Sequence, residues 1–445
     1  MSDIDLLLKN GEVVTPWGIQ SLDIAVKDGR ITALGKFKGA AAREVFDAAH
    51  LHVLPGVIDS QVHFREPGAT HKEDLETGGR AAVLGGVTAV FEMPNTDPPT
   101  TNAEALADKL ARARGRMHCN HAFYVGATPE NAEALAALEM LEGCAGVKMF
   151  MGSSTGSLLV ADDEHVARVL RSGRRRMAVH AEDEARLKDR KALAIKGDPR
   201  THPVWRDAEA ALRASQRLIA LARVAGRLVH VLHVSTAEEM AFLGANKDLA
   251  TIETTVNHLT LVAPDCYERL GTYAQMNPPV RDARHREAIW DAIRNGTVDV
   301  IGSDHAPHTR EEKDKVYPAT PSGMPGVQTL VPVMLDHVNK GRLTLERFAD
   351  LTAHGPQRVF GLMGKGRIAI GYDADFTLID LKAEREIKND WIASRCAWTP
   401  FDGMQVKGWP KATIIAGRVI MREDAIIEEG AVGRPLRFQS TLTSA

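Results

Sequence analysis

Six polar side chains lie at the ends of short apolar runs, where they could act together. Imidazole and carboxylate groups are ligands that zinc and similar borderline cations prefer in proteins. Taken singly, each residue has a structural explanation, because strand-end histidines are often only hydrogen-bonded, aspartates cap helices and lysines extend to solvent. Six at successive run ends instead predict a shared site. In chain order they are His63, Asn95, Lys148, His180, His233 and Asp304.

The apolar runs alternate with stretches of helical periodicity, and this alternation predicts parallel strand–helix–strand units. Roughly eight units favour a (β/α)8 TIM barrel, in which all strand ends converge on one face. Periodicity alone leaves a doubly wound sheet open. The helical stretches include Ala103–Arg114, Ala208–Ala225 and Arg284–Asn295. The strand candidates are Val53–Ile58, Ala89–Met93, His121–Val125, Gly146–Met149, Met177–His180, Leu228–His233, Val298–Ile301 and either Ile252–Thr255 or Gln275–Met276.

Both ends of the chain carry hairpin patterns instead. Asn10-Gly11 and Asp28-Gly29 separate short alternating segments near the N-terminus, and Gly417 separates two more near the C-terminus. We therefore predict an α/β protein in which residues 1–53 and 366–445 form a small β-sandwich domain and residues 54–365 form the barrel. The stretch after Gly430 is polar and predicts an extended arm.

Composition excludes several classes of protein. The net charge of −3 favours neither nucleic acid nor an anionic membrane surface, and no apolar run approaches the roughly 20 residues that span a bilayer. The first residues, Met1 to Asp5, lack the basic and apolar segments of a signal peptide. The four cysteines have no metal or redox spacing, which is typical of free thiols in a reducing compartment. We expect a cytoplasmic protein with a small-molecule substrate.

The stretch from Asp59 to Gly68, Asp-Ser-Gln-Val-His-Phe-Arg-Glu-Pro-Gly, resembles the metal-binding motif of the cyclic amidohydrolases, the dihydroorotase group in particular. The family has His-x-His where this chain has Gln61-Val62-His63. The segment Gly146 to Phe150, Gly-Val-Lys-Met-Phe, is similar to the family's bridging-lysine segment. The resemblance extends over essentially the whole chain.

The resemblance implies a zinc centre built on a modified lysine. Burial and neighbouring cations lower the pKa of a lysine, and the neutral amine can then add carbon dioxide. Lys148 would become a carbamate that bridges two metals. His180 and His233 would hold one ion, and His63 with Asp304 the other. Gln61 would replace a histidine with a neutral, weaker donor, so we expect one or two Zn²⁺ per chain, the site beside Gln61 being weak.

Arg65 indicates which ring the enzyme opens. Dihydroorotate carries a free carboxylate, which a planar guanidinium binds through two parallel hydrogen bonds. The other explanation for Arg65 is a surface salt bridge to Glu66 or Glu73. By resemblance, the substrate-binding residues are Arg65, Asn95, Asn277, His308, Ser322 and Gly323. The charged segment Thr309–Thr320 between the last of them is expected to be a solvated loop.

The resemblance therefore implies a dihydroorotase, which hydrolyses the cyclic amide of dihydroorotate to N-carbamoyl-aspartate reversibly in pyrimidine biosynthesis. Asp304 would take a proton from the nucleophile and deliver it to the departing nitrogen. Two alternatives stay open: an allantoinase or a dihydropyrimidinase of the hydantoinase type, and a non-catalytic partner subunit, for instance of aspartate transcarbamoylase. Family members form homodimers or homotetramers, so we expect one of these assemblies.

Overall fold

Eight parallel strands form the centre of the molecule, in the order β13-β12-β11-β10-β9-β8-β7-β6. The computed structural model describes residues 4–154, 156–427 and 430–441, so Met1–Asp3 and their signal-peptide prediction lie outside the described residues. The His63 amide donates to the carbonyl of His305 at 2.7 Å and joins the first strand to the segment after the last. This closure confirms the barrel over the doubly wound sheet. The strands are β6 (Val57–Val62), β7 (Val87–Glu92), β8 (Asn120–Gly126), β9 (Cys144–Phe150), β10 (Met177–His180), β11 (Val229–Val231), β12 (Ala250–Thr255) and β13 (Val300–Gly302).

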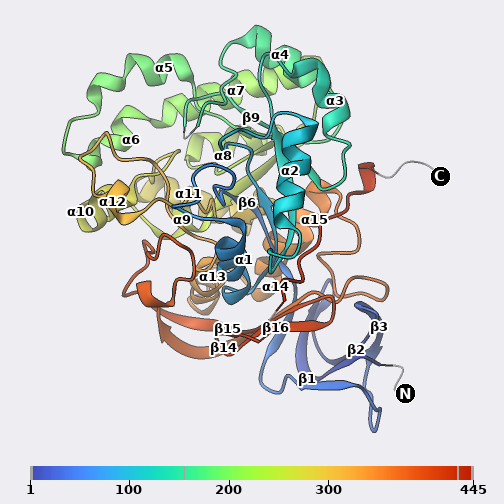
Figure 1. The fold of residues 1–445 in the computed structure, drawn as a ribbon. Coiled ribbons are helices and arrows are strands. Elements are labelled where there is room, and N and C mark those ends of the chain that lie inside the picture. Colours follow the sequence, from blue (N-terminus) through green and yellow to red (C-terminus); the bar gives the residue numbers. More distant parts are fainter. Residues whose placement is uncertain (1–3, 155, 428–429, 442–445) are drawn as a thin grey trace.

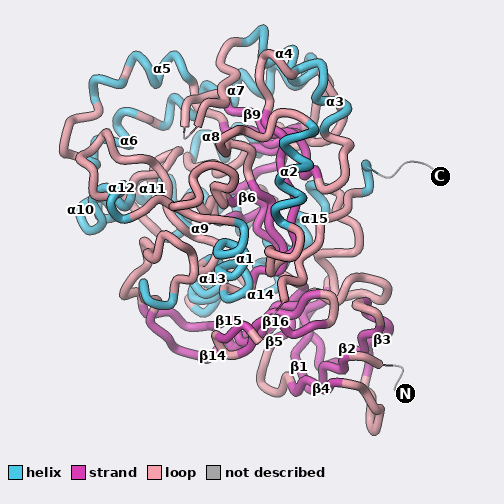
Figure 2. The backbone as a smooth tube through the Cα atoms, in the orientation of Figure 1, coloured by secondary structure: helices cyan, strands magenta, loops and turns pink. Residues whose placement is uncertain are grey.

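Helices surround this barrel, as Figures 1 and 2 show. Their ends follow local chemistry: Asp207 caps the first turn of the long helix α7, and Gly226, with φ +66°, ends it. No described helix is both long enough and apolar enough to cross a membrane. The helices are α1 (Leu75–Leu84), α2 (Ala103–Ala113), α3 (Leu135–Leu138), α4 (Asp163–Arg171), α5 (Glu184–Asp189), α6 (His202–Trp205), α7 (Ala208–Ala225), α8 (Ala237–Gly244), α9 (Val256–Thr260), α10 (Asp265–Leu270), α11 (Ala283–Arg294), α12 (Arg310–Lys313), α13 (Leu330–Asn339), α14 (Leu345–Ala349) and α15 (Gly355–Phe360).

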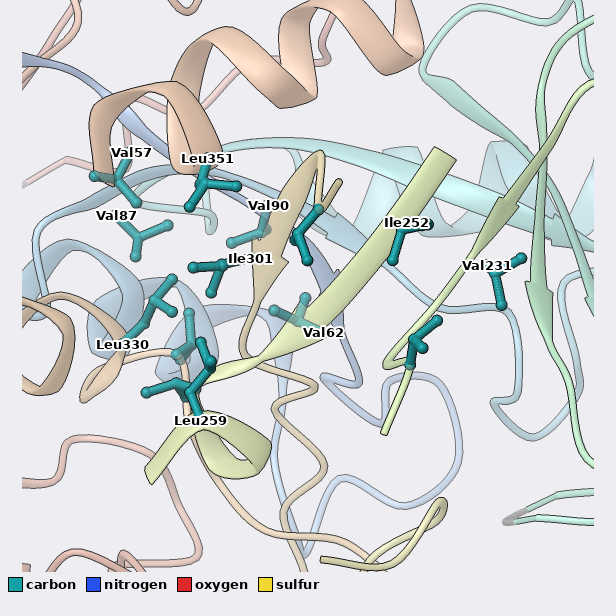
Figure 3. Close-up of a cluster of buried hydrophobic side chains, with 14 of the residues drawn as sticks. Val57, Val62, Val87, Val90, Val231, Ile252, Leu259, Ile301, Leu330 and Leu351 are labelled. Carbon is teal, nitrogen blue, oxygen red and sulfur yellow. The ribbon is translucent and has the colours of Figure 1, made fainter. Parts of the chain in front are cut away.

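The core lies between the strands and the helices. Figure 3 shows Val57, Val87, Val90 and Ile301 of the barrel strands gathered near Leu330 and Leu351 of the helical segments. Such residues are β-branched or leucine and fully buried, which suits strands covered on both faces. Burying a side chain of this size stabilises the fold by about 1.5–3 kcal/mol.

The two ends of the chain meet in a second, nine-stranded sheet, at the lower edge of Figure 1. The N-terminal strands connect to the C-terminal ones where β5 pairs antiparallel with β14. Its own apolar cluster includes Ile24, Val53 and Phe376. The strands are β1 (Leu6–Thr15), β2 (Gly18–Lys27), β3 (Arg30–Gly35), β4 (Glu44–Asp47), β5 (His52–Pro55), β14 (Phe376–Glu386), β15 (Gln405–Ile415), β16 (Arg418–Arg422) and β17 (Ala425–Ile426).

Two local predictions differ from the structure, and a third, left open between two segments, is decided by it. Asn10-Gly11 is not a turn but an irregularity inside β1, where the pairing register shifts and Asn10 has φ +64°. The run Val53–Ile58 is divided between β5 of the small sheet and β6 of the barrel. Ile252–Thr255 lies in a barrel strand, whereas Gln275–Met276 does not. Asp28-Gly29 does form the predicted turn, between β2 and β3.

The described part of the C-terminal segment, residues 430–441, does not project as an arm. Leu436 and Phe438 are buried, and Phe438 packs against Phe91 of β7 and beneath the guanidinium of Arg175. The backbone of Pro435 pairs with His121 of β8. Two buried apolar side chains and backbone hydrogen bonds to His121 thus hold a segment whose overall composition is polar.

Candidate active site

One narrow pocket collects the predicted site residues at the carboxyl ends of the barrel strands. His308 is the exception, and it lies behind the pocket in contact with Arg65. Phe150, Ser154 and Ala306 complete the lining. The predicted residues that line the pocket are Gln61, His63, Arg65, Asn95, Lys148, His180, His233, Asn277, Asp304, Ser322 and Gly323.

Asp304 connects the first and last barrel strands. Its Oδ1 is 3.2 Å from Nε2 of His63 and accepts a hydrogen bond from Nε2 of Gln61 at 3.0 Å. His63 also contacts Oδ1 of Asn95 through Nδ1, at 2.8 Å. Asp304 has φ +47°, in the left-handed region that non-glycine residues adopt at a cost, often at functional sites. Oε1 of Gln61 is buried without a hydrogen-bond partner among the described residues.

Lys148 points its amine into the pocket from β9. The side chain is 1% exposed, and Nζ has no hydrogen-bond partner in the described part of the chain. Nζ lies 4.4 Å from the centre of the Phe150 ring. Burial lowers the pKa of Lys148 to about 7, although the charges of Asp304 and Glu253 oppose the shift. A large share of the amine is therefore neutral at pH 7.

His180 and His233 face each other on neighbouring strands. Nδ1 of His180 is 3.0 Å from Nε2 of His233, close to the roughly 3.3 Å that separates two nitrogens of one tetrahedral zinc ion. Burial lowers the pKa of both imidazoles, which keeps them neutral as metal ligands must be. The opposite nitrogen of His180, Nε2, contacts Oε2 of Glu182 at 2.9 Å.

Glu182 is a buried carboxylate in contact with His180, and the sequence analysis did not single it out. Burial raises its pKa, but the charge of Arg206 and hydrogen bonds from Arg206 and His180 outweigh that effect and hold the pKa well below its usual value. The only signal in the sequence was a glutamate two residues after a strand-end histidine. Nothing local indicated that Arg206, 24 positions further on, would bind it.

Arg65 lies on the pocket wall, held from behind. Its Nε donates to the carbonyl of Pro307 at 3.2 Å, and Nη2 is 3.3 Å from Nε2 of His308. The predicted alternative, a bridge to Glu66 or Glu73, does not form: Arg116 binds Glu66, and Thr77 and Ser394 bind Glu73. Burial lowers the pKa of Arg65 to about 10, so the group stays charged at neutral pH.

His308 joins Arg65 to the segment at Ser322. Its Nε2 contacts the carbonyl of Ser322 at 3.0 Å, and its Nδ1 is 3.1 Å from Nζ of Lys72. Burial lowers the pKa of His308 to about 3. A neutral ring satisfies the contacts with Ser322 and Lys72 when Nε2 carries the proton and Nδ1 accepts from the lysine. With that tautomer the contact between Nε2 and the guanidinium of Arg65 is a packing contact and not a hydrogen bond.

The segment around Gly323 requires glycine and is held by a buried lysine. Gly323 has φ +146°, and an added Cβ would lie 2.4 Å from the carbonyl oxygen of Ala306. Lys313 is fully buried and donates to the carbonyls of Gln275, Pro321 and Gly323 at 3.3, 2.9 and 3.1 Å. The charged segment Thr309–Thr320 is thus anchored at this lysine rather than solvated throughout.

Asn277 also lines the pocket. Its Oδ1 is 3.0 Å from Nε2 of His202, and its Nδ2 is 3.4 Å from Oγ of Ser154. His202 also contacts the carbonyl of Met276 at 3.0 Å. These contacts hold an amide beside the pocket, where it can hydrogen-bond a ring substrate.

The donor set suits a metal ion only if the lysine or the glutamine takes part. No group of three or more described His, Cys, Asp and Glu side chains converges closely enough to hold an ion. Nζ of Lys148 and Oε1 of Gln61 are buried and have no hydrogen-bond partner among the residues that the structure describes. An unpartnered polar atom in a buried site calls for a ligand or water. Lys148 lines the same pocket, so its amine can complete a donor set with His180 and His233 or with His63 and Asp304.

Comparisons with known proteins agree with this architecture. The model of the amidohydrolase family matches residues 52–420. A dihydroorotase of Methanosarcina mazei is 36% identical, with 99% of each chain covered. An allantoinase of Solibacter usitatus is also 36% identical, with 95% of this chain and 94% of that one covered. The solved L-hydantoinase of Arthrobacter aurescens superimposes with a TM-score of 0.92 at 30% identity, over 98% of this chain and 100% of that one.

Proposed function

Since the chain belongs to the amidohydrolase family and is an enzyme that hydrolyses cyclic amides, we propose that its substrate is dihydroorotate. The reaction would open the ring to N-carbamoyl-aspartate, and run in the closing direction in pyrimidine biosynthesis. The relatives include dihydroorotases, allantoinases and hydantoinases, so the choice depends on residues of this pocket.

The environment of Arg65 supports dihydroorotate over allantoin and dihydrouracil as the substrate. It is a buried guanidinium on the pocket wall, and no described carboxylate lies within ion-pair distance of it. A buried charge without a protein counter-ion is costly, and a substrate carboxylate would satisfy it. Dihydroorotate carries that carboxylate, whereas allantoin and dihydrouracil do not. Asn95 lines the same pocket and lies within reach of a bound ring.

We propose that zinc binds at Lys148, His180 and His233, and that a second, weaker position lies at His63, Asp304 and Gln61. The unpartnered Lys148 amine and the paired imidazoles support the first position. Addition of carbon dioxide to the amine, with release of one proton, would give an anionic oxygen ligand. When bound, zinc lowers the pKa of water and polarises a carbonyl.

Asp304 would move the proton during ring opening. Both hydrogen-bond contacts of its carboxylate are to Oδ1, from His63 and Gln61, which leaves Oδ2 to accept the proton of the attacking water. As the new C–O bond forms and the ring C–N bond breaks, the same carboxyl would return that proton to the departing nitrogen. Arg65, Asn277 and the Ser322–Gly323 backbone would orient the ring, which lowers the entropic part of the barrier.

Two measurements on one preparation test this function. Turnover of dihydroorotate, allantoin and dihydrouracil is compared, and zinc per chain is measured. The proposal predicts that dihydroorotate has the highest kcat/KM and that at least one zinc ion binds. Faster hydrolysis of allantoin or dihydrouracil would assign the chain to one of the alternative activities. A chain that binds no zinc and turns over none of the three would refute both the substrate assignment and the proposed metal positions.

A further inference from the structure

Three buried side chains form a connected row behind the pocket. His180, Glu182 and Arg206 are 1%, 0% and 2% exposed. Oε2 of Glu182 lies 2.9 Å from Nε2 of His180, and Nε of Arg206 donates to Oε1 of Glu182 at 3.2 Å. Nη2 of Arg206 also binds Oε2 of the same carboxylate. Both oxygens of Glu182 are therefore engaged.

This row determines which nitrogen of His180 carries the proton. A neutral imidazole has one N–H, and a carboxylate can only accept a hydrogen bond. The contact with Glu182 therefore places the proton on Nε2. Nδ1 then carries no proton, and this is the nitrogen that lies 3.0 Å from Nε2 of His233. The orientation presents an unprotonated nitrogen to the position where the two histidines converge.

We propose that Glu182 is a positioning residue, which fixes the tautomer and ring orientation of His180 so that Nδ1 can bind a metal ion. This inference rests on the zinc position proposed above. A carboxylate that accepts from the second nitrogen of a metal-binding histidine raises the basicity of the ligand and removes the need to reorient it on binding.

Arg206 extends the arrangement to the loop that follows β9. Besides Glu182, it donates through Nη2 to the carbonyl of Ser153 at 2.8 Å. The adjacent Ser154 lines the pocket. Arg281 in turn donates to the backbone carbonyl of Arg206. The guanidinium thus holds Glu182 in place and ties the histidine ligand to the loop that borders the substrate.

A second buried pair supplies a matched control. Glu139 and Arg227 are 0% and 2% exposed, and Nη2 of Arg227 donates to Oε2 of Glu139 at 2.5 Å. Glu139 also accepts the backbone N–H groups of Arg174 and Arg175, and it does not line the pocket. Breaking either pair leaves an uncompensated buried charge, but only the Glu182 pair contacts a proposed metal ligand.

The test compares Glu182→Gln with Glu139→Gln. Zinc affinity is measured by competition with a chromophoric chelator, on protein shown to be folded by circular dichroism. A glutamine amide can either accept from Nε2 or donate to it, so it no longer selects one tautomer. The proposal predicts a zinc affinity about 10–100-fold weaker for Glu182→Gln, and wild-type affinity for Glu139→Gln. The visible spectrum of the cobalt-loaded protein should change only in the Glu182 variant.

Two outcomes would overturn the proposal: wild-type zinc affinity in folded Glu182→Gln, or an equal loss in both variants. If Glu182→Gln does not fold, the double variant Glu182→Gln/Arg206→Gln removes both buried charges. Its zinc affinity is then compared with that of the wild type and of Glu139→Gln in the same way. Failure of zinc to bind the wild type would overturn the positioning role together with the proposed metal site. If the wild type binds zinc but does not turn over dihydroorotate, and Glu182→Gln still weakens zinc binding, only the substrate assignment is refuted.

Discussion

Replacing Arg65 with alanine should reduce turnover of dihydroorotate far more than turnover of dihydrouracil. Both substrates contain the ring amide, but only dihydroorotate has a carboxylate for the guanidinium to bind. The side chain is 5% exposed and Nε is held by the carbonyl of Pro307, so the terminal nitrogens are fixed before substrate arrives. A preorganised contact of this kind loses little side-chain entropy on binding.

The size of the effect follows from the number of hydrogen bonds lost. A bidentate contact to a carboxylate contains two charge-assisted bonds, each contributing about 1.5–3 kcal/mol. Partial rehydration of the vacated pocket offsets some of this, which leaves about 2–4 kcal/mol in kcat/KM. At 1.36 kcal/mol per decade, the loss is about 30–1,000-fold for dihydroorotate.

The assay measures kcat/KM for both substrates with wild-type protein, Arg65→Ala and Arg65→Gln at equal zinc content. Thermal unfolding of each variant shows whether the fold is preserved. The glutamine variant can keep a hydrogen bond but not the charge, so it should retain only a small part of the dihydroorotate activity. An equal loss for dihydroorotate and dihydrouracil would refute the reasoning, because Arg65 would then support the pocket without contacting the carboxylate.

The other predictions concern the proton carrier, the metal and the pH dependence of stability. Asp304→Asn should lower kcat by more than tenfold, a barrier increase above about 1.4 kcal/mol, while thermal stability and the zinc at Lys148, His180 and His233 stay near wild type; a smaller loss would exclude Asp304 as the proton carrier. Gradual chelation should remove one zinc well before the other. Gln61→His should reduce this difference in zinc affinity, since imidazole is a better zinc donor than a neutral amide. Two zinc ions of equal affinity in the wild type, unchanged by the substitution, would place Gln61 away from the metal. Burial lowers the pKa of His202 and of His230 to about 3, below the value of about 6.5 in an unfolded chain. The unfolded state therefore binds more protons, and the free energy of unfolding should fall as the pH drops from 6.5 towards 3, by up to about 1.4 kcal/mol per pH unit for each histidine. Urea unfolding at pH 7 and pH 5 checks this, and equal stabilities at the two values would contradict it.

The sequence favoured the barrel, and with it predicted that the site residues gather at one face, although only the contact between the first strand and the segment after the last one decided against a doubly wound sheet. Strand and helix periods are local properties of the side-chain pattern, and parallel strands bring all their carboxyl ends to one face. Polar residues that end successive apolar runs must therefore approach one another, whatever the details of packing. This is why residues as distant as His63 and Asp304 could be assigned to one site before their 3.2 Å contact was known.

The sequence was less informative where a short segment could belong to either of two sheets. Val53–Ile58 is one apolar run, but its first half pairs with β1 and β14 while its second half enters the barrel. Asn10-Gly11 has the composition of a hairpin turn and forms an irregularity within β1. Strand pairing depends on partners distant in the chain, and neither composition nor period identifies them.

Only the tertiary structure revealed the contacts behind the pocket. Glu182 pairs with Arg206, Lys313 donates to the carbonyls near Gly323, and the ring of Phe438 packs against that of Phe91. Each of these side chains would also be compatible with a solvent-exposed position, because a charged or isolated residue has no period that marks it as buried. Their burial depends on neighbours supplied by other turns of the barrel. The sequence thus determined which groups reach the pocket, and the packing of distant segments decided how those groups are held and which nitrogen of His180 faces it.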